Sequence, residues 1–96
     1  MRKVYIVTYD ISDTRRREVV FRILRGFGDH LQYSVFRCEL SGSELVRLRG
    51  RLIDAIHAHE DQVLFADVGP ATKRGRRAIT AIGRRYTHPE RHALIF

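Results

Sequence analysis

Residues 3–9 read KVYIVTY, and the polar stretch Asp10-Ile11-Ser12-Asp13 follows them directly. A nearly continuous run of β-branched and aromatic residues is typical of a strand that is buried on both faces of a sheet. Ser12 or Asp13 can cap a helix that begins after this stretch. The fold is therefore expected to start with a central strand that leads into a helix, with Asp10 at the carboxyl end of the strand.

Residues 14–27 predict that helix. Its apolar positions repeat with helical spacing, and they are Val20, Ile23, Leu24 and Phe27. Its opposite side carries Arg15, Glu18, Arg22 and Arg25. Gly28 is placed to act as the C-terminal cap.

Residues 31–40 (LQYSVFRCEL) read as one long strand, and a second helix follows to about residue 58. Ser41 and Glu44 have the spacing of a capping box at the start of this helix. Its apolar stripe consists of Leu45, Leu48, Leu52 and Ile56. Residues 62–68 predict a third strand, residues 73–77 a basic loop, and residues 78–83 a short fourth strand.

This order predicts an α+β, ferredoxin-like sandwich, with two helices on one face of a mainly antiparallel four-stranded sheet. Such a fold normally has two strands between its helices, so the long strand is either split by a bulge or the topology is a variant. We expect one domain over residues 1–96, with a core at about 1–83 and a tail at 84–96.

The composition indicates a polyanionic partner. The 96 residues carry a formal charge of +7, and sixteen of the eighteen basic residues are Arg. The planar guanidinium group binds phosphate through two parallel hydrogen bonds, so the favoured partner is nucleic acid. The alternative is a basic, solvated surface without a specific partner.

The single cysteine, Cys38, excludes a disulfide framework and a multi-cysteine zinc site, and it fits a reducing cytoplasm. No apolar run approaches the roughly 20 residues that span a bilayer, so no membrane partner is expected. The N-terminus leads directly into a strand, which predicts no signal peptide.

Asp10 is the main candidate for chemistry. Ligand and metal sites gather at the carboxyl ends of strands in α/β sheets. A carboxylate there can hold Mg²⁺ while Arg15, Arg16 and Arg17 bind phosphate oxygens, which suits metal-assisted phosphodiester cleavage. The alternative is that Asp10 only caps the helix. One carboxylate is a poor Mg²⁺ site, and a two-fold dimer would supply the second.

Other residues are weaker candidates. The five histidines, at positions 30, 57, 59, 88 and 92, lack metal-ligand spacing and are expected at the surface, so zinc is not expected. Tyr33 and Phe36 could stack nucleobases. We expect Tyr33 in the core and leave the position of Phe36 open.

The end of the chain suggests two kinds of contact. Basic side chains between residues 73 and 85 are candidates for binding nucleic acid, namely Lys73, Arg74, Arg76, Arg77, Arg84 and Arg85. Residues 93–96 (ALIF) are too apolar to remain in water, so we expect a second copy of the chain to cover them in a homodimer.

Several motifs together resemble one family. They are VTYDIS (residues 7–12), TRRREVV (14–20), Gly28 and QYSVF (32–36). The chain is similar in these motifs to the CRISPR-associated protein two family, which belongs to the adaptation machinery of prokaryotic antiviral defence. The resemblance extends over nearly the whole chain, although the segment at 73–85 is more basic than the family requires.

The resemblance implies a ferredoxin-like homodimer whose C-terminal strand packs on the partner subunit. It further implies that Asp10 of each subunit binds a divalent metal, usually Mg²⁺ or else Mn²⁺. The residues expected to support this site are Tyr9, Arg16, Arg17, Ser34 and Phe36.

Three functions are compatible with this resemblance. The first is a metal-dependent endonuclease of spacer acquisition that cleaves RNA or double-stranded DNA. The second is a non-catalytic adaptor that bridges integrase dimers on DNA. The third is a toxin-type endoribonuclease of the same fold.

Overall fold

The computed structural model of this chain describes residues 1–86, without the side chains of Lys73 and Arg76. The elements follow the order β1 (Lys3–Asp10), α1 (Thr14–Arg25), β2 (Asp29–Gln32), β3 (Val35–Leu40), α2 (Gly42–Ala55), β4 (Gln62–Pro70) and α3 (Lys73–Arg76). Among the described residues, no helix is long and apolar enough to cross a membrane.

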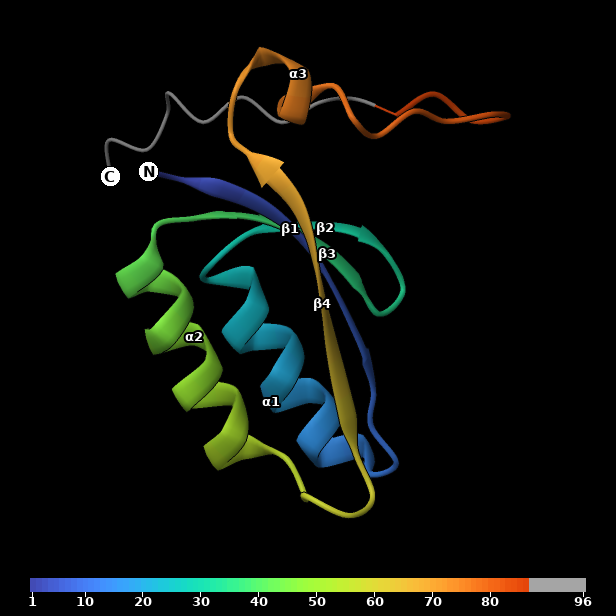
Figure 1. The fold of residues 1–96 in the computed structure, drawn as a ribbon. Coiled ribbons are helices and arrows are strands. Elements are labelled where there is room, and N and C mark those ends of the chain that lie inside the picture. The colour runs from blue at the N-terminus through green and yellow to red at the C-terminus, as the bar shows by residue number, and fades with distance from the viewer. Residues whose placement is uncertain (87–96) are drawn as a thin grey trace.

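The four strands form one antiparallel sheet in the order β2-β3-β1-β4, which places β1 in its interior. Both long helices cover the same face of this sheet (Figure 1). The prediction of a ferredoxin-like α+β sandwich is therefore confirmed. Four residues of β1 are buried, as expected for a central strand: Val4, Tyr5, Val7 and Tyr9.

The prediction of one long strand over residues 31–40 is wrong, because the chain turns within it. Residues on either side of the turn pair with each other, Gln32 with Val35. Tyr33 takes a positive φ of 23° to make the turn, a conformation that sequence patterns for strands do not reveal because it normally belongs to Gly, Asn or Asp. The turn supplies the second inter-helix strand that the fold requires.

The helix ends follow the sequence closely, with two differences. The capping box of Ser41 and Glu44 is present, as predicted. Helix α2 ends at Ala55, three residues earlier than expected, and α1 is capped by Gly26. Gly28 has another role, because a Cβ at this position would lie 2.5 Å from the Sγ atom of Cys38. The chain can pass this close to β3 only where no side chain intervenes.

The core lies between the sheet and the two long helices. Its fully enclosed side chains include Phe36, Leu24, Leu48, Val7 and Val20. The predicted stripe of α2 faces it, with Leu48 and Leu52 buried and Leu45 and Ile56 packed at the margin. This apolar contact holds α1 and α2 against one face of the sheet and leaves the other face free of long helices within residues 1–86.

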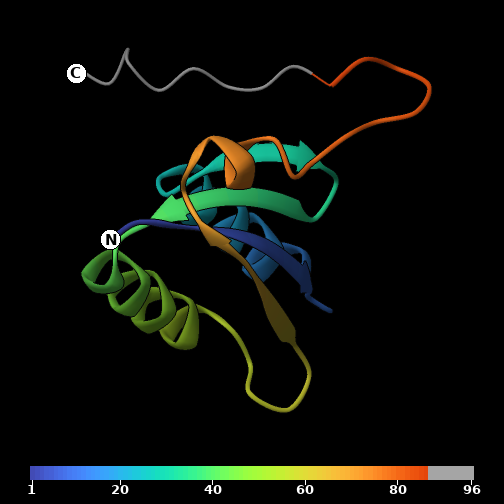
Figure 2. The ribbon, with the colours of Figure 1, turned by 45° about the horizontal axis from the view of Figure 1, so that its top comes forward.

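The segment that follows β4 lies on the face of the sheet away from α1 and α2 (Figure 2). The basic loop predicted at residues 73–77 contains the short helix α3, whose N-cap is Thr72. No strand forms at residues 78–83, so that prediction is wrong. The sheet already has its fourth strand from the turn at Tyr33. The apolar residues 93–96 and most of the predicted tail lie outside the described residues.

Candidate active site

Asp10 is the last residue of β1 and is exposed. Its backbone pairs with Gln62 of β4, while Tyr9 and Val7 before it contribute to the core. Successive side chains of a strand alternate between faces, so Asp10 belongs with Thr8 and Ile6 to the face away from the helices. Within residues 1–86, its carboxylate makes no hydrogen bond or ion pair.

Capping does not account for Asp10. The N-cap of α1 is Asp13, whose carboxylate accepts a hydrogen bond from the Arg16 backbone N–H at 2.9 Å. The sequence left open that Asp10 only caps the helix, and this capping role belongs to Asp13 instead. An exposed carboxylate at a strand end, without a structural partner, is available to a ligand.

Two of the predicted supporting residues adjoin Asp10 through the backbone. The N–H of Tyr9 donates to the carbonyl oxygen of Ser34 at 3.1 Å, so the β2–β3 turn lies beside the end of β1. The ring of Tyr9 points into the core, where burial raises the pKa of its hydroxyl and the charge of Arg17 partly offsets that rise. The buried ring of Tyr9 therefore holds the end of β1 against the core.

The structure places the two aromatic residues of the turn region, Phe36 and Tyr33, in opposite environments, and the sequence had left the position of Phe36 open. Phe36 is fully buried, and its ring lies 5.4 Å from that of Phe21 and 4.9 Å from that of His30. Tyr33, which we expected in the core, is 94% exposed. The error follows from the missed turn, since the alternation of faces predicted for one strand does not continue through a reversal.

Arg16 contacts a carboxylate rather than the site at Asp10. The buried carboxylate of Asp61 accepts hydrogen bonds from Ser12 N (3.0 Å), Ser12 Oγ (3.2 Å), Arg16 Nε (2.8 Å), Arg16 Nη2 (3.3 Å) and His57 N (2.8 Å). The Arg16 guanidinium holds the pKa of the Asp61 carboxyl far below its usual range. We call Arg16, Asp61 and Ser12 the carboxylate clamp.

The carboxylate clamp connects the β1–α1 loop to the loop before β4. Its Ser12 is two residues from Asp10, and its Asp61 precedes Gln62, the pairing partner of Asp10. Sequence reasoning missed Asp61, because its role depends on the pairing of β1 with β4. Only that pairing brings residues 12 and 61 together.

The other two arginines of this region have fewer contacts. The guanidinium of Arg17 donates to the carbonyl oxygen of Ile11, with Nη2 at 3.2 Å. Arg15 is exposed, and no contact with Asp10 is formed by either side chain within the described residues. None of the three arginines is therefore in contact with Asp10 among the described residues, and their binding of phosphate stays a prediction.

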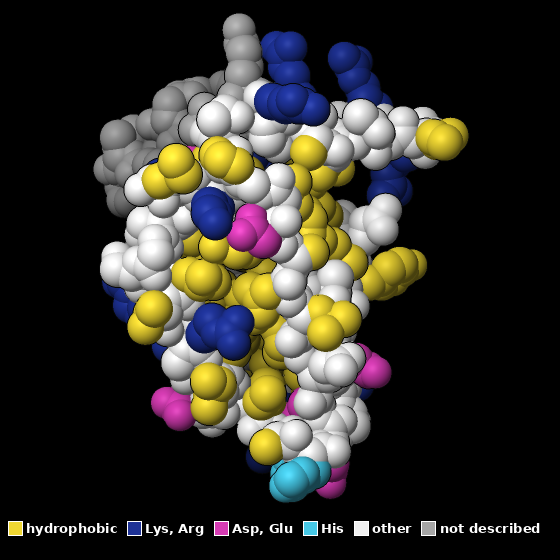
Figure 3. Space-filling model, in the orientation of Figure 1, with side chains coloured by type: hydrophobic (Ala, Val, Ile, Leu, Met, Phe, Trp, Pro, Cys, Tyr) yellow, Lys and Arg dark blue, Asp and Glu magenta, His cyan; other side chains and the backbone are white. Residues whose placement is uncertain are grey.

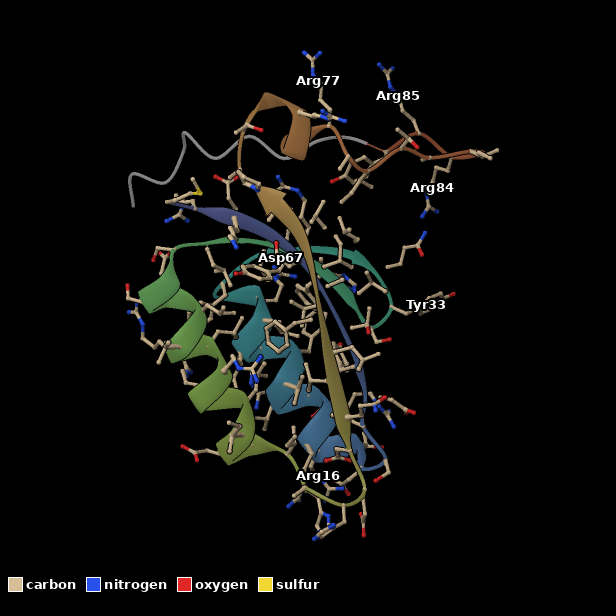
Figure 4. The ribbon with its side chains drawn as sticks, viewed as in Figure 1. Arg16, Tyr33, Asp67, Arg77, Arg84 and Arg85 are labelled. Atoms are coloured by element: carbon tan, nitrogen blue, oxygen red, sulfur yellow. The ribbon has the colours of Figure 1, made fainter. Side chains whose placement is uncertain are left out.

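The basic segment after β4 presents a different surface. Arg74, Arg77, Arg84 and Arg85 are all exposed. In Figure 4, Arg77 and Arg85 project away from the body of the protein, at the end opposite Arg16, while Arg84 points the other way from the same segment. The side chains of Lys73 and Arg76 are not among those that the structure describes. Exposed guanidinium groups of this kind can bind phosphate without first breaking an internal ion pair.

An apolar groove lies between α2 and β4 (Figure 3). It has a volume of about 390 Å³, and its lining includes Leu52, Ile53, Ile56, Val63 and Phe65. Within residues 1–86, β4 pairs only with β1, so its outer edge has no partner strand. The groove and the strand edge together form a surface that an apolar segment could cover.

Within residues 1–86, no group of three or more His, Cys, Asp or Glu side chains could hold a metal ion. Within the part of the chain that the structure describes, Asp10 would therefore be one carboxylate ligand of a site that other groups must complete. Mg²⁺ is commonly held by one or two carboxylates with water and phosphate oxygens completing its shell. The donor chemistry fits Mg²⁺ provided that a second chain or a substrate supplies further oxygens.

Comparison with known proteins identifies the family. Residues 2–75 match the family model described as CRISPR associated protein Cas2. The chain belongs to the Cas2 family. This result confirms the resemblance seen in the sequence motifs.

Relatives and solved structures agree with this assignment. The chain is 36% identical over 91 residues to a CRISPR-associated endoribonuclease Cas2 from Rhodospirillum rubrum, covering 95% of this chain and 88% of that protein. It is 35% identical over 95 residues to one from Geobacter sulfurreducens, covering 99% of each. A crystal structure of Streptococcus pyogenes Cas2 superposes with a TM-score of 0.71 at 26% identity, covering 83% of this chain and 99% of that one.

Proposed function

We propose that this chain is a metal-dependent endoribonuclease of CRISPR spacer acquisition that works as a homodimer. Its relatives from Rhodospirillum rubrum and Geobacter sulfurreducens are named endoribonucleases. The observation that carries the proposal is the position of Asp10, an exposed carboxylate at the end of a buried strand. It does not cap α1, because Asp13 is the N-cap of that helix. Its lack of a partner within residues 1–86 leaves it available to a cation.

In this proposal, Asp10 of each subunit binds Mg²⁺ or Mn²⁺ near the two-fold axis. The metal would supply an activated water and stabilise charge on the phosphate. The protein's own contribution is to hold the two carboxylates in position and to bind the flanking phosphates. Tyr9, Ser34 and the carboxylate clamp fix the end of β1, while the exposed arginines attract the polyanion.

The proposed homodimer is supported by the unpaired edge of β4, by the apolar groove beside it, and by the apolar residues 93–96. An apolar strand from a second copy could extend the sheet and fill the groove. Light scattering at micromolar concentration should give the mass of a dimer. Deletion of residues 93–96 should lower that mass, whereas a monomeric wild-type protein would contradict the proposal.

Asp10→Asn tests the catalytic assignment. The substitution keeps the shape of the side chain but removes the anionic oxygen that a hard cation prefers. We expect Mg²⁺-dependent cleavage of RNA to fall by orders of magnitude, because the metal contributes several kcal/mol to lowering the barrier. Asp13→Asn is the matched control, since Asn caps a helix about as well as Asp, and it should retain cleavage. Activity that survives in nuclease-free Asp10→Asn protein would show that Asp10 is not the ligand.

The second candidate function is a non-catalytic adaptor that holds integrase subunits on double-stranded DNA. The exposed arginines favour it, because they project from the opposite end of the molecule to Arg16 and could follow a long duplex (Figure 4). Absence of cleavage in both the wild-type and Asp10→Asn proteins, with DNA binding intact in both, would favour this adaptor over the nuclease.

A further inference from the structure

A cleft of about 350 Å³ lies between the end of α1 and the first half of α2. Three arginines from two parts of the chain line it: Arg2, Arg47 and Arg51. In Figure 1, α1 ends and α2 begins at the end of the molecule that carries α3. Arg2 precedes β1 and Asp10 ends it, so the cleft and the candidate active site are separated by the length of that strand, about 26 Å.

The two acidic side chains of the cleft, Glu39 and Glu44, already have partners. Arg2 donates to Glu44 Oε1 at 2.7 Å, and its Nε lies 3.8 Å from Glu39 Oε2. Glu44 also accepts the backbone N–H of Ser41 at 2.8 Å, which lowers the pKa of the Glu44 carboxyl. Glu39 has a second basic partner in Arg37, at 3.5 Å. Neither carboxylate therefore neutralises the two arginines of α2.

Those two arginines have no such partner. Arg47 and Arg51 are exposed, and within residues 1–86 neither forms a hydrogen bond or an ion pair. They are four positions apart, so they lie on the same side of the helix, about 6 Å apart along its axis. Like charges at this spacing disfavour a helix, so helix stability does not account for the pair. An anion bound between the two guanidinium groups would remove their repulsion.

The guanidinium group of Arg51 is held by an aromatic ring. Its Cζ atom lies 6.0 Å from the centroid of the ring of Phe27, a residue that packs against the core. A guanidinium group on a ring face keeps the N–H donors along its edge free, and these donors match the oxygens of a phosphate. Arg51 therefore keeps its donors available beside the cleft that it lines.

The cleft is connected to the basic segment after β4. The carbonyl oxygen of Arg2 accepts a hydrogen bond from the N–H of Ala71 at 2.9 Å. Arg74 and Arg77 follow shortly after Ala71 and are exposed. In Figure 4, Arg77 lies at the end of the molecule opposite Arg16, which is the end where α2 begins. Exposed arginines therefore extend from the basic segment onto the layer of helices.

From this arrangement we infer that the cleft binds a phosphate group of a nucleic-acid backbone, held between Arg47 and Arg51. The strand reaches the cleft from the basic segment and crosses the layer of helices, on the side of the sheet away from Asp10. Contacts to phosphate oxygens carry no sequence information, so binding there is independent of base sequence.

This inference rests on the nucleic-acid binding in the proposed function and adds the surface that a bound strand follows. A strand that covers the basic segment and the helices is held without entering the site at Asp10. The cleft therefore gives the chain a contact with nucleic acid that is remote from the candidate active site.

The test compares two arginines of α2 that each lie over a phenylalanine ring. Arg51 lies over Phe27 in the cleft, whereas Arg49 lies 5.2 Å from the ring centroid of Phe65, in the groove between α2 and β4. Arg51→Gln and Arg49→Gln therefore remove the same charge from the same helix. Fluorescence anisotropy across a salt series measures binding of the full-length protein, in EDTA, to a fluorescein-labelled DNA duplex and to a single-stranded RNA.

On the duplex, Arg51→Gln should reduce the slope of log affinity against log salt by about 0.9, and Arg47→Gln with Arg51→Gln by about 1.8. On the single-stranded RNA, the reduction should be about 0.7 per lost contact. Arg49→Gln should leave both slopes unchanged. Arg51→Lys keeps the positive charge and should keep the wild-type slope. Melting temperatures should differ little among these variants, because all three arginines are exposed.

The opposing outcomes are distinct. An equal reduction in Arg49→Gln and Arg51→Gln would show general electrostatic attraction and would overturn the cleft, as would an unchanged slope in the double variant. Loss of the dimer in the double variant, measured by light scattering, would make the cleft a subunit contact instead. If the double variant lost binding of AMP but kept the wild-type slopes, the cleft would be a site for a free nucleotide and the strand path would be wrong.

Failure of this inference is distinguishable from failure of the proposed nuclease. The expected reduction in slope, in a protein that cleaves nothing, would support the cleft and reject only the nuclease. Normal cleavage by a double variant with unchanged slopes would reject only the cleft.

Discussion

Arg16 and Arg77 carry the same charge, yet they lie at opposite ends of the molecule in opposite states (Figure 4). Arg16 is bound to the buried carboxylate of Asp61 at 2.8 Å, and its side chain is only 28% exposed. Arg77 projects into solvent after α3. A count of arginines treats the two alike, so the count predicts a basic protein but not which side chains are available to a phosphate.

What separates the two residues is the presence of a buried acid. Asp61 has no exposed surface on its side chain, and removing Arg16 would leave its charge without compensation. No such partner faces Arg77 among the described residues. The clamped end of the molecule should therefore respond to substitution through stability, and the basic end through binding.

The largest expected effect is on the carboxylate clamp. Asp61→Asn removes the ion pair with Arg16 and weakens the acceptor for Ser12 and His57, so we expect the melting temperature to fall by many degrees. Asp67→Asn is the matched control, because its carboxylate pairs with Lys3 at 3.3 Å in an exposed position. Exposed pairs contribute little, so differential scanning calorimetry should detect almost no change. An equal fall in melting temperature in the two variants would contradict the idea that the buried carboxylate of Asp61 contributes more to stability than an exposed ion pair.

Acidification should produce a smaller version of the same effect. The pKa of Asp61 is depressed in the folded protein. Its ionised carboxylate therefore contributes fully to the free energy of unfolding above its unfolded pKa of about 3.9, and this contribution is lost as the pH falls further. Chemical denaturation between pH 7 and pH 2 should show this loss in wild type. The difference in stability between wild type and Asp61→Asn should shrink towards acid pH, and a constant difference would contradict the linkage.

The smallest expected effect belongs to the basic end. Arg74→Gln with Arg77→Gln should leave the melting temperature unchanged, because both side chains are exposed. The slope of log affinity against log salt should decrease by about 0.7 per lost contact on single strands or about 0.9 on duplex DNA. Fluorescence anisotropy across a salt series measures this slope. An unchanged slope would mean that these arginines face no phosphate.

The sequence predicted the features that depend on neighbouring residues, and it missed those that depend on contacts between residues far apart in the chain. Helix stripes, the capping box and the central strand depend on neighbouring residues, and all of them are confirmed. The turn at Tyr33 depends on a strained backbone angle that no nearby glycine announces. The role of Asp61 depends on the pairing of β1 with β4, between residues far apart in sequence.

The candidate site divides in the same way. The position of Asp10 at the end of a buried strand could be predicted, since that is a local pattern, while its role as a metal ligand stays a prediction. The sequence wrongly placed Tyr33 in the core and left Phe36 open, because one missed reversal changes the alternation for the whole segment. The family resemblance predicts that Asp10 and its neighbours form one site, but it does not reveal that Arg16 is bound to Asp61.

The close passage of Gly28 beside Cys38 has a practical consequence. The thiol is fully buried, in a packing that has no room for even a methyl group at position 28. Reagents such as maleimides should therefore not reach it in the folded protein, since they require an accessible thiolate. A cysteine introduced at an exposed position such as Arg84 would carry the only reactive label, so fluorophores or spin labels can be attached there without altering the native sequence elsewhere.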